Sequence, residues 1–300
     1  RRLMSVWCVT TFVRRKISDT VKTFSFLLIS VLAVTVRVSA QQRIITAGSA
    51  ITETVCALGE CDKIIASDRT SLYPPQIQEL SSIGYRSGIN AEGIISLKPT
   101  LIIAEKDYVE DAVLSQLSST NIRLITIERN NDVDNTKKLI TEIAEALGRQ
   151  AEGKKLIAKI EDDLTDAGIL LQRGTSTPRV LCVYNRGAAT VSMAGRETFA
   201  DILKYVGAEN AIKNADGYKP LNAEALIAAD PEFILMVSSG FESIGGMEGV
   251  LKIPGVSQTI AGKKKQIIEI DALRLTNFGP RVGETVKELV LLLHPELQAK

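Results

Sequence analysis

The sequence predicts an α/β protein with two similar lobes, a long helix that joins them, and a ligand cleft between them. Two observations support this prediction. After residue 40, short apolar runs alternate with segments of helical periodicity, which is typical of α/β folds. In addition, the stretch 90–103 recurs without a gap at 222–235, and each copy holds Asn-Ala-Glu, a helical turn, a proline and an apolar strand.

The first 40 residues have the pattern of an export signal that is removed. They hold seven of the 36 Lys and Arg residues and one of the 35 acidic residues, which leaves 29 basic against 34 acidic. A basic segment, 14–16, precedes the apolar run 24–36 and the small-x-small site 38–40. The run is shorter than the roughly 20 residues that span a membrane. Since the chain begins at Arg1 and not at Met, we expect the residues before about 13 to be an upstream extension.

The mature chain is therefore predicted to begin at Gln41 and to reside in the periplasm. No cysteine follows the cleavage site, so we expect neither a lipid anchor nor a membrane anchor. The predicted domains are an N-terminal lobe at 41–147, a linking helix at 148–174 and a C-terminal lobe at 175–300.

The elements follow from the apolar pattern. In the first lobe we expect strands at 43–47, 64–67, 101–104 and 123–127, and helices at 52–58, 92–97 and 109–117. Almost nothing interrupts the helical pattern of 135–172, which predicts a shorter helix to Leu147 and then a long one. A strand at 180–184 restarts the alternation.

The composition gives little support to catalysis or to nucleic-acid binding. The chain has one histidine, His294, which leaves no material for a Ser-His-Asp triad or a His-rich metal site, and we interpret it as a solvated helix-end residue. No phosphate-binding loop is present. A net charge of +1 and an aromatic content of 5% do not indicate a nucleic-acid partner. We therefore expect a binding protein and not an enzyme.

Three cysteines remain after the signal. Cys56 and Cys61 flank Gly59, where a helix is expected to end, so the turn is able to bring them together. An oxidising compartment would permit a disulfide. A pair of buried free cysteines explains the pattern equally well, and both hypotheses stay open. Cys182 lies within an apolar run and is predicted to be an inert core residue.

Tyr73 has an unusual setting. It follows a predicted strand on the loop 67–75, and Pro74 and Pro75 stiffen the chain directly after it. Such strand-end loops often carry binding residues. Tyrosine is also an established axial ligand of haem iron. The residues alone nevertheless favour an ordinary surface or half-buried tyrosine.

Several motifs together resemble the periplasmic haem-binding proteins of haem ABC importers. They are Thr-Ser-Leu-Tyr-Pro-Pro at 70–75, Ile-Gly-Tyr-Arg at 83–86 and Asn-Ala-Glu-Gly-Ile-Ile-Ser-Leu-Lys-Pro-Thr at 90–100. The segments 194–198, 253–256 and 275–281 agree, so the resemblance covers 43–295. The wider class that binds ferric siderophores and cobalamin shares helix–Pro–strand and Gly-Pro-Arg, whereas Ser-Leu-Tyr-Pro is specific to haem binders.

This resemblance implies two Rossmann-like lobes joined by one rigid helix, with haem as the transported ligand and Tyr73 as its iron ligand. It also implies that Glu92 and Glu224 dock onto arginines of the importer's permease subunits; the simpler interpretation is two helix-start glutamates stabilised by the helix dipole. We expect a monomer that acts in iron acquisition. The alternative is the same fold with a ferric siderophore or cobalamin as its ligand.

The chain departs from the haem-binding pattern at two places. Some relatives carry a histidine in the stretch that corresponds to 184–189, and this chain has none, so we expect one haem with one strong ligand. Some place a basic residue two positions after the tyrosine, where this chain has Pro75; Arg69 and Arg86 are candidates for that role. Arg186 and Arg274 are candidates for binding the haem propionates, with solvated surface arginines as the equally good interpretation.

Overall fold

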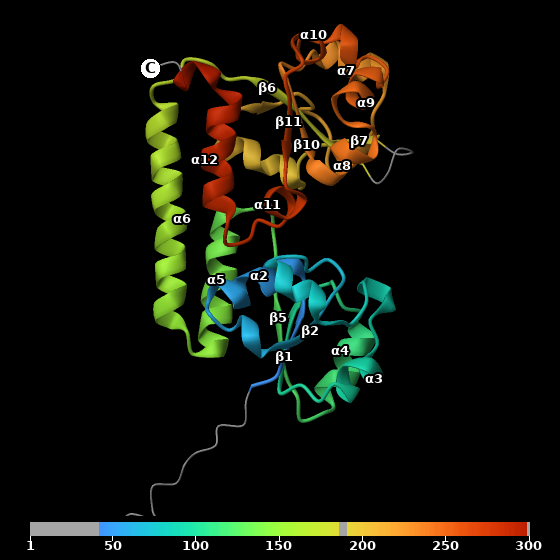
Figure 1. Ribbon diagram of the computed structural model, residues 1–300, viewed down its shortest axis with the longest axis vertical. Helices are drawn as coiled ribbons and strands as arrows, with labels where there is room; N and C mark the ends of the chain where they lie inside the picture. The colour runs from blue at the N-terminus through green and yellow to red at the C-terminus, as the bar shows by residue number, and fades with distance from the viewer. Residues whose placement is uncertain (1–41, 186–190, 299–300) are drawn as a thin grey trace, which may run out of the picture. The chain divides into compact units, whose positions relative to one another are not determined.

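The computed structural model describes residues 42–185 and 191–298, which contain two β-sheets (Figure 1). The expected export signal and Arg186 lie outside the described residues. The first sheet is parallel, with the strand order β3-β2-β1-β4-β5. Its strands are β1 (Ile44–Ala47), β2 (Ile64–Ser67), β3 (Ser81–Ser82), β4 (Leu101–Glu105) and β5 (Arg123–Ile127). Its helices are α2 (Ser49–Ala57), α3 (Ala91–Ser96) and α4 (Asp111–Ser118).

The second sheet is mixed, with the order β11-β10-β6-β7-β9 and β8 beside β6. Strand β7 is antiparallel to β6 and to β9, and the other pairs are parallel. The strands are β6 (Arg179–Asn185), β7 (Val191–Ala194), β8 (Glu209–Asn210), β9 (Tyr218–Pro220), β10 (Phe233–Val237) and β11 (Ile267–Ile270). The helices of this half are α7 (Ala223–Ala229), α8 (Ser238–Ser243), α9 (Gly246–Lys252), α10 (Ile260–Lys264), α11 (Ala272–Thr276) and α12 (Val282–Leu293). The fold is thus α/β with two Rossmann-like lobes.

The strands form where the sequence is apolar without interruption, because helices cover both faces of the central strands. All residues of β1 and β10 are buried. In the first lobe, Ile44 packs in a cluster with Leu139 on one face, and Ile45 packs with Ile94 and Leu117 on the other. Of the described helices, none combines the length and the apolar character needed to span a membrane.

Two helices connect the lobes. Helix α5 (Val133–Leu147) begins after Asp132, whose carboxylate accepts the Asp134 N–H, and it ends at Gly148, which adopts a left-handed conformation with φ of 70°. The 22 residues of α6 (Gln150–Leu171) then run back toward the second lobe and pack against α12. A Cβ atom on Gly283 of α12 would lie 2.9 Å from the Cβ atom of Asp163, so glycine permits this close helix crossing.

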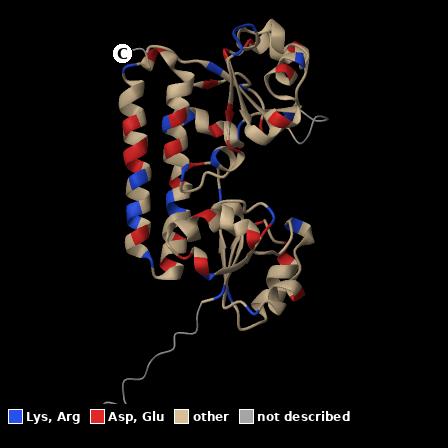
Figure 2. Ribbon diagram, in the orientation of Figure 1, with Lys and Arg blue, Asp and Glu red and all other residues tan. Residues whose placement is uncertain are grey.

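Ion pairs line the seam between α6 and α12, where Lys and Arg alternate with Asp and Glu (Figure 2). Lys287 contacts Asp163 at 3.2 Å and Asp166 at 2.9 Å, and Lys159 pairs with Glu284. These pairs are largely exposed, so each contributes little to stability. They fix the register of two helices whose buried faces hold the lobes together.

The repeat in the sequence folds twice into the same unit. Asn90 before α3 and Asn222 before α7 each accept a hydrogen bond at 2.7 Å from the N–H of the third residue that follows. Their φ and ψ angles are −131° and 148° in the first copy and −125° and 150° in the second. Lys98 and Asp230 end the two helices in left-handed conformations, and each precedes a proline and a central strand, β4 or β10.

The structure corrects the expectation for His294. Its side chain is 1% exposed, and its Nε2 atom lies 2.8 Å from the carbonyl oxygen of Val206. The end of α12 packs onto the turn after the 3₁₀-helix Phe199–Tyr205, which removes the ring from water. Cys182 is buried as predicted, and burial raises the pKa of its thiol.

Candidate functional site

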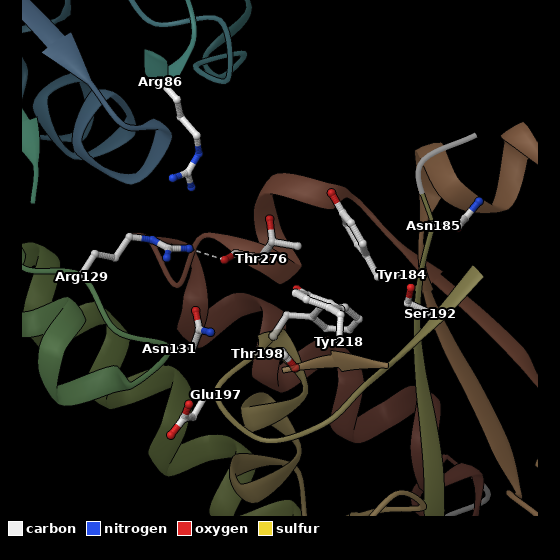
Figure 3. A pocket seen from close by; sticks show the side chains of 11 residues that line it. Arg86, Arg129, Asn131, Tyr184, Asn185, Ser192, Glu197, Thr198, Tyr218 and Thr276 are labelled. Carbon is white, nitrogen blue, oxygen red and sulfur yellow. Dashed lines mark hydrogen bonds between the residues drawn. The ribbon is translucent and has the colours of Figure 1, made fainter. Parts of the chain in front are cut away.

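The two lobes line a cleft that contains two adjoining cavities. The outer cavity has a volume of about 560 Å³ (Figure 3), and the inner one has a volume of about 510 Å³. Arg86, Arg129, Tyr184, Asn185 and Thr276 line both, so the two cavities are parts of one interlobe cleft. Cavities of this size are typical of small-molecule sites.

Aromatic pairs stand on both walls of the cleft. On the first lobe, Tyr85 and Tyr108 form an edge-to-face pair with centroids 6.1 Å apart. On the second lobe, the rings of Tyr184 and Tyr218 lie 5.1 Å apart, and Phe199 lies 6.4 Å beyond Tyr218. Aromatic side chains from both lobes, of which Tyr184 lines both cavities, provide a large apolar contact area that suits a flat, mostly apolar ligand.

Arg69, Arg86 and Arg129 add positive charge to the same cleft. The guanidinium of Arg86 lies over the rings of Tyr85 and Tyr108, 5.8 and 5.1 Å from their centroids. Arg69 lines the inner cavity. Within the described part of the chain, neither of these two arginines forms an ion pair with an acidic side chain. Their guanidinium groups are therefore available to bind the carboxylates of a ligand.

Arg129, after β5, joins the two lobes at the cleft. Its Nε donates to the carbonyl of Asn277 at 3.1 Å, and its Nη2 donates to the carbonyl of Thr276 at 2.5 Å (Figure 3). Its Nη1 lies 3.8 Å from Glu105 at the end of β4. Burial raises the pKa of Glu105, and the charges of Arg129 and Arg86 oppose that shift.

A buried carboxylate holds the loop after β2. Asp68 accepts hydrogen bonds from the N–H groups of Gly48 at 2.9 Å and Thr70 at 2.8 Å, and from the hydroxyls of Ser71 and Tyr108 at 2.6 Å. Burial, and then the bond to Asp68, raise the pKa of Tyr108, so this phenol stays neutral. The network anchors the chain immediately before Tyr73.

Tyr73 itself lines neither cavity of the cleft; it lies in a separate groove of about 330 Å³ that Lys159 of α6 and Glu284 of α12 also line. Its side chain is 40% exposed, and the guanidinium carbon of Arg281 lies 3.8 Å from its ring centroid. Arg281 comes from the second lobe and forms a two-point ion pair with Glu53 of α2, at 2.5 and 3.0 Å. The neighbouring Leu72, in contrast, lines the inner cavity.

A disulfide joins Cys56 and Cys61 close to the same loop. Cys56 lines the groove that contains Tyr73 and Pro74, and the side-chain amide of Gln76 lies 3.6 Å from the sulfur of Cys61. The crosslink closes the end of α2 directly beneath the loop.

The structure brings some of the predicted site residues together and leaves others apart. Arg69 and Arg86 line the cleft, whereas Tyr73 lies in the separate groove next to α6 and α12. Arg274 lines neither cavity; it pairs with Glu288 of α12 at 2.6 Å. Glu92 on α3 and Glu224 on α7 are exposed. Both helices lie on the side of the molecule away from α6 and α12 (Figure 1).

Sequence reasoning missed Arg129 and the four-tyrosine lining. Arg129 follows a strand in a polar segment with no recognisable motif, and its partners are backbone atoms near residue 276. Tyr184 and Tyr218 are 34 positions apart in the sequence, on strands β6 and β9, which both pair with β7. A signal was available for Tyr184, since it stands at the carboxyl end of the predicted strand 180–184, where ligands bind in α/β folds.

Comparison with known proteins places the chain among binding proteins. A family model described as periplasmic binding protein matches residues 44–273. The periplasmic haem-binding protein RhuT from Roseiflexus sp. RS-1, in its apo form, is 34% identical with a TM-score of 0.81, over 86% of this chain and 100% of that one. The periplasmic haem-binding protein BhuT, in complex with two haems, is 33% identical with a TM-score of 0.80, over 85% and 99%.

Three relatives found by sequence include two with other ligands in their names. The ABC transporter substrate-binding lipoprotein YvrC of Bacillus subtilis is 25% identical over 82% of this chain and 77% of its own. A vitamin B12-binding protein of Photorhabdus laumondii is 27% identical over 69% and 74%. The Fe(3+)-citrate-binding protein YfmC of B. subtilis is 29% identical over 71% and 67%.

Proposed function

Because this chain belongs to the periplasmic binding protein family, we propose that it captures one haem between its lobes and delivers it to an ABC-type importer. The family and the solved neighbours are substrate-binding transport proteins. The observation that carries the choice of haem is the cleft itself, with aromatic pairs on both walls and arginines between them. Haem-binding neighbours above 30% identity support the same choice.

The chemistry of haem fits these groups part by part. The porphyrin is flat and apolar, so it gains contact area between Tyr85 and Tyr218. Its two propionates are anions, for which Arg69 and Arg86 supply guanidinium groups that form no ion pair within the described residues. Arg274 is a weaker candidate because Glu288 already neutralises it.

Tyr73 is our proposed iron ligand. It directly follows Leu72, which lines the inner cavity, and its side chain is 40% exposed. We propose that this side chain turns toward the cleft when haem binds. This movement would break the contact between the Tyr73 ring and the guanidinium of Arg281. A neutral tyrosine has a pKa of about 10, but a bound ferric ion strongly favours the phenolate. Tyr108 is a poorer ligand because Asp68 already accepts its proton in a hydrogen bond.

Titration of the mature protein with hemin tests this assignment. We expect a five-coordinate, high-spin ferric spectrum with a phenolate-to-iron charge-transfer band. Tyr73→Phe should remove the band and weaken binding, whereas Tyr218→Phe, which removes the hydroxyl of an exposed tyrosine in the cleft, should retain the band. An unchanged spectrum and affinity in Tyr73→Phe would disprove the assignment.

The second candidate is the same cleft with a ferric siderophore or cobalamin. The vitamin B12-binding and Fe(3+)-citrate-binding relatives favour it. Such ligands bring their own chelating groups, so their binding should not depend on the hydroxyl of Tyr73. Competition between hemin, cyanocobalamin and ferric citrate for the purified protein separates the two candidates.

We further propose export to the periplasm, with residues 1–40 as the cleaved signal, and docking through Glu92 and Glu224. Both glutamates are exposed at equivalent positions of the repeated unit, and this repetition supports a two-fold symmetric partner. The chain is proposed to have no catalytic activity of its own, since its sole histidine is buried against Val206, away from the cleft.

A further inference from the structure

Each helix that carries an expected docking glutamate also exposes an isoleucine one turn later. Ile95 follows Glu92 by three residues on α3, and Ile227 follows Glu224 by three residues on α7. Residues three apart lie on the same face of a helix. Both isoleucines are 39% exposed, while the residue before each one is buried.

A single exposed isoleucine needs no explanation, because much of any protein surface is apolar. Here the exposure recurs. Among the described residues, eight large apolar side chains are highly exposed, and two of them occupy the same position of the repeated unit. The caps and the left-handed helix ends around them also match between the copies. The duplicated unit therefore presents the same carboxylate and the same apolar side chain twice.

We propose that Ile95 and Ile227 are twin apolar anchors for the importer's two permease subunits. The inference rests on the proposed transport function. Each permease subunit would present a basic group to one glutamate and an adjoining apolar pocket to the isoleucine. Within the described residues, Glu92 and Glu224 form no ion pairs, so both charges are available to such a partner. Helices α3 and α7 lie on the side away from α6 and α12, so neither is covered by the helical seam (Figure 1).

The two kinds of side chain make different contributions to docking. A carboxylate attracts its partner at a distance, so changing it alters the association rate and the salt dependence. An isoleucine acts only in contact, so changing it raises the dissociation rate at any salt concentration. This difference separates an anchor from a residue that merely adjusts the local charge.

The test uses Ile95→Ser, Ile227→Ser and the double variant with the organism's haem importer reconstituted in nanodiscs. Ile169→Ser on α6 is the matched control, because Ile169 is 45% exposed outside the repeated unit. We expect each single variant to raise the concentration of hemin-loaded protein that half-saturates ATPase stimulation by about three- to eightfold, given the 39% exposure, and the double variant by about the product. Hemin affinity and the control should not change.

Several outcomes would overturn the proposal. Full stimulation by the double isoleucine variant, while Glu92→Lys plus Glu224→Lys fails, refutes the anchors and leaves the docking function intact. Normal transport by the glutamate variant refutes the docking function. A loss of hemin affinity in the isoleucine variants assigns them a structural role. A dimer in sedimentation that Ile95→Ser dissolves would assign the surface to a second copy of this chain.

Discussion

Arg281 holds Glu53 in a two-point ion pair that crosses from one lobe to the other. The carboxylate of Glu53 is 4% exposed, and the same guanidinium supports the ring of Tyr73. Burial raises the pKa of Glu53, and the hydrogen bond and charge of Arg281 oppose that shift. One cation therefore stabilises a buried charge and also contacts the ring of the proposed ligand side chain.

Arg281→Met should destabilise the protein by about 3 kcal/mol at neutral pH, because it leaves a buried carboxylate without a partner. The loss should be smaller at pH 5 than at pH 8: a raised pKa lets Glu53 take up a proton as the pH falls, and the neutral acid costs less to bury. Urea denaturation at the two pH values measures this. When Glu53→Gln is added to Arg281→Met, it should restore most of the lost stability, because it removes the buried charge. An equal loss at both pH values would contradict the account.

Charge reversal at both docking glutamates should separate binding from delivery. Glu92→Lys plus Glu224→Lys places like charges opposite the importer's arginines, so ATPase stimulation and haem uptake should fail. Hemin affinity should stay nearly unchanged, because neither side chain lines the cleft. Isothermal titration and transport in vesicles measure the two properties. Normal transport would leave these glutamates as ordinary helix-start residues.

The disulfide has a simple mass signature. The peptide with Cys56 and Cys61 should be two hydrogens lighter in non-reduced periplasmic protein. The double variant Cys56→Ser plus Cys61→Ser should lose only about 2 kcal/mol, at the lower end for disulfides, because the closed loop is short. Two free thiols in freshly isolated protein would rule out the bond.

Asp132 should make stability depend on acid pH. The hydrogen bond from Lys204, at 2.7 Å, lowers the pKa of Asp132 to about 2 from an ordinary 3.8, although burial opposes the shift. This stabilisation is present above the ordinary pKa and is lost as the pH falls through about 2. Because the pair is partly exposed, it amounts to about 1 kcal/mol.

Asp132→Asn keeps the helix cap but removes the charge. It should therefore lose about 1 kcal/mol at neutral pH and show a flatter pH dependence of stability between about pH 4 and pH 2. Lys204→Met should give the same profile, and the double variant should add nothing further. Independent, additive losses would show that the two groups are not coupled.

The sequence predicts the sheets better than the helix ends. The strands at 64–67 and 123–127 have the predicted bounds. The first is almost wholly buried, whereas the second is an edge strand that exposes Arg123 and Thr126. Helix α2 begins at Ser49 and not at the predicted residue 52, because Gly48 precedes it without a side-chain cap that would mark the start. The repeat was visible because cap, proline and strand recur at a fixed spacing.

Contacts between distant segments were beyond the sequence pattern. His294 stands at a helix end, where a polar residue usually meets water, yet it is buried against Val206, 88 positions away. Arg274, one of two candidates for the propionates, pairs with Glu288 on α12, a contact that no local pattern indicates. The position of Tyr73 over Arg281 likewise depends on a contact between the lobes. Local patterns show which residue types are present, but the topology selects their partners.

Contacts from the segment 276–281 cross the base of the cleft. Thr136 donates to the carbonyl of Phe278 at 2.6 Å and Ser49 to the side chain of Asn277 at 2.8 Å, beside the bonds of Arg129. Lobes tied in this way move little, so the empty and loaded carriers present nearly the same outer surface. We therefore expect empty carrier to compete with loaded carrier for the importer. The cell then gains more uptake from keeping the carrier filled than from making more of it.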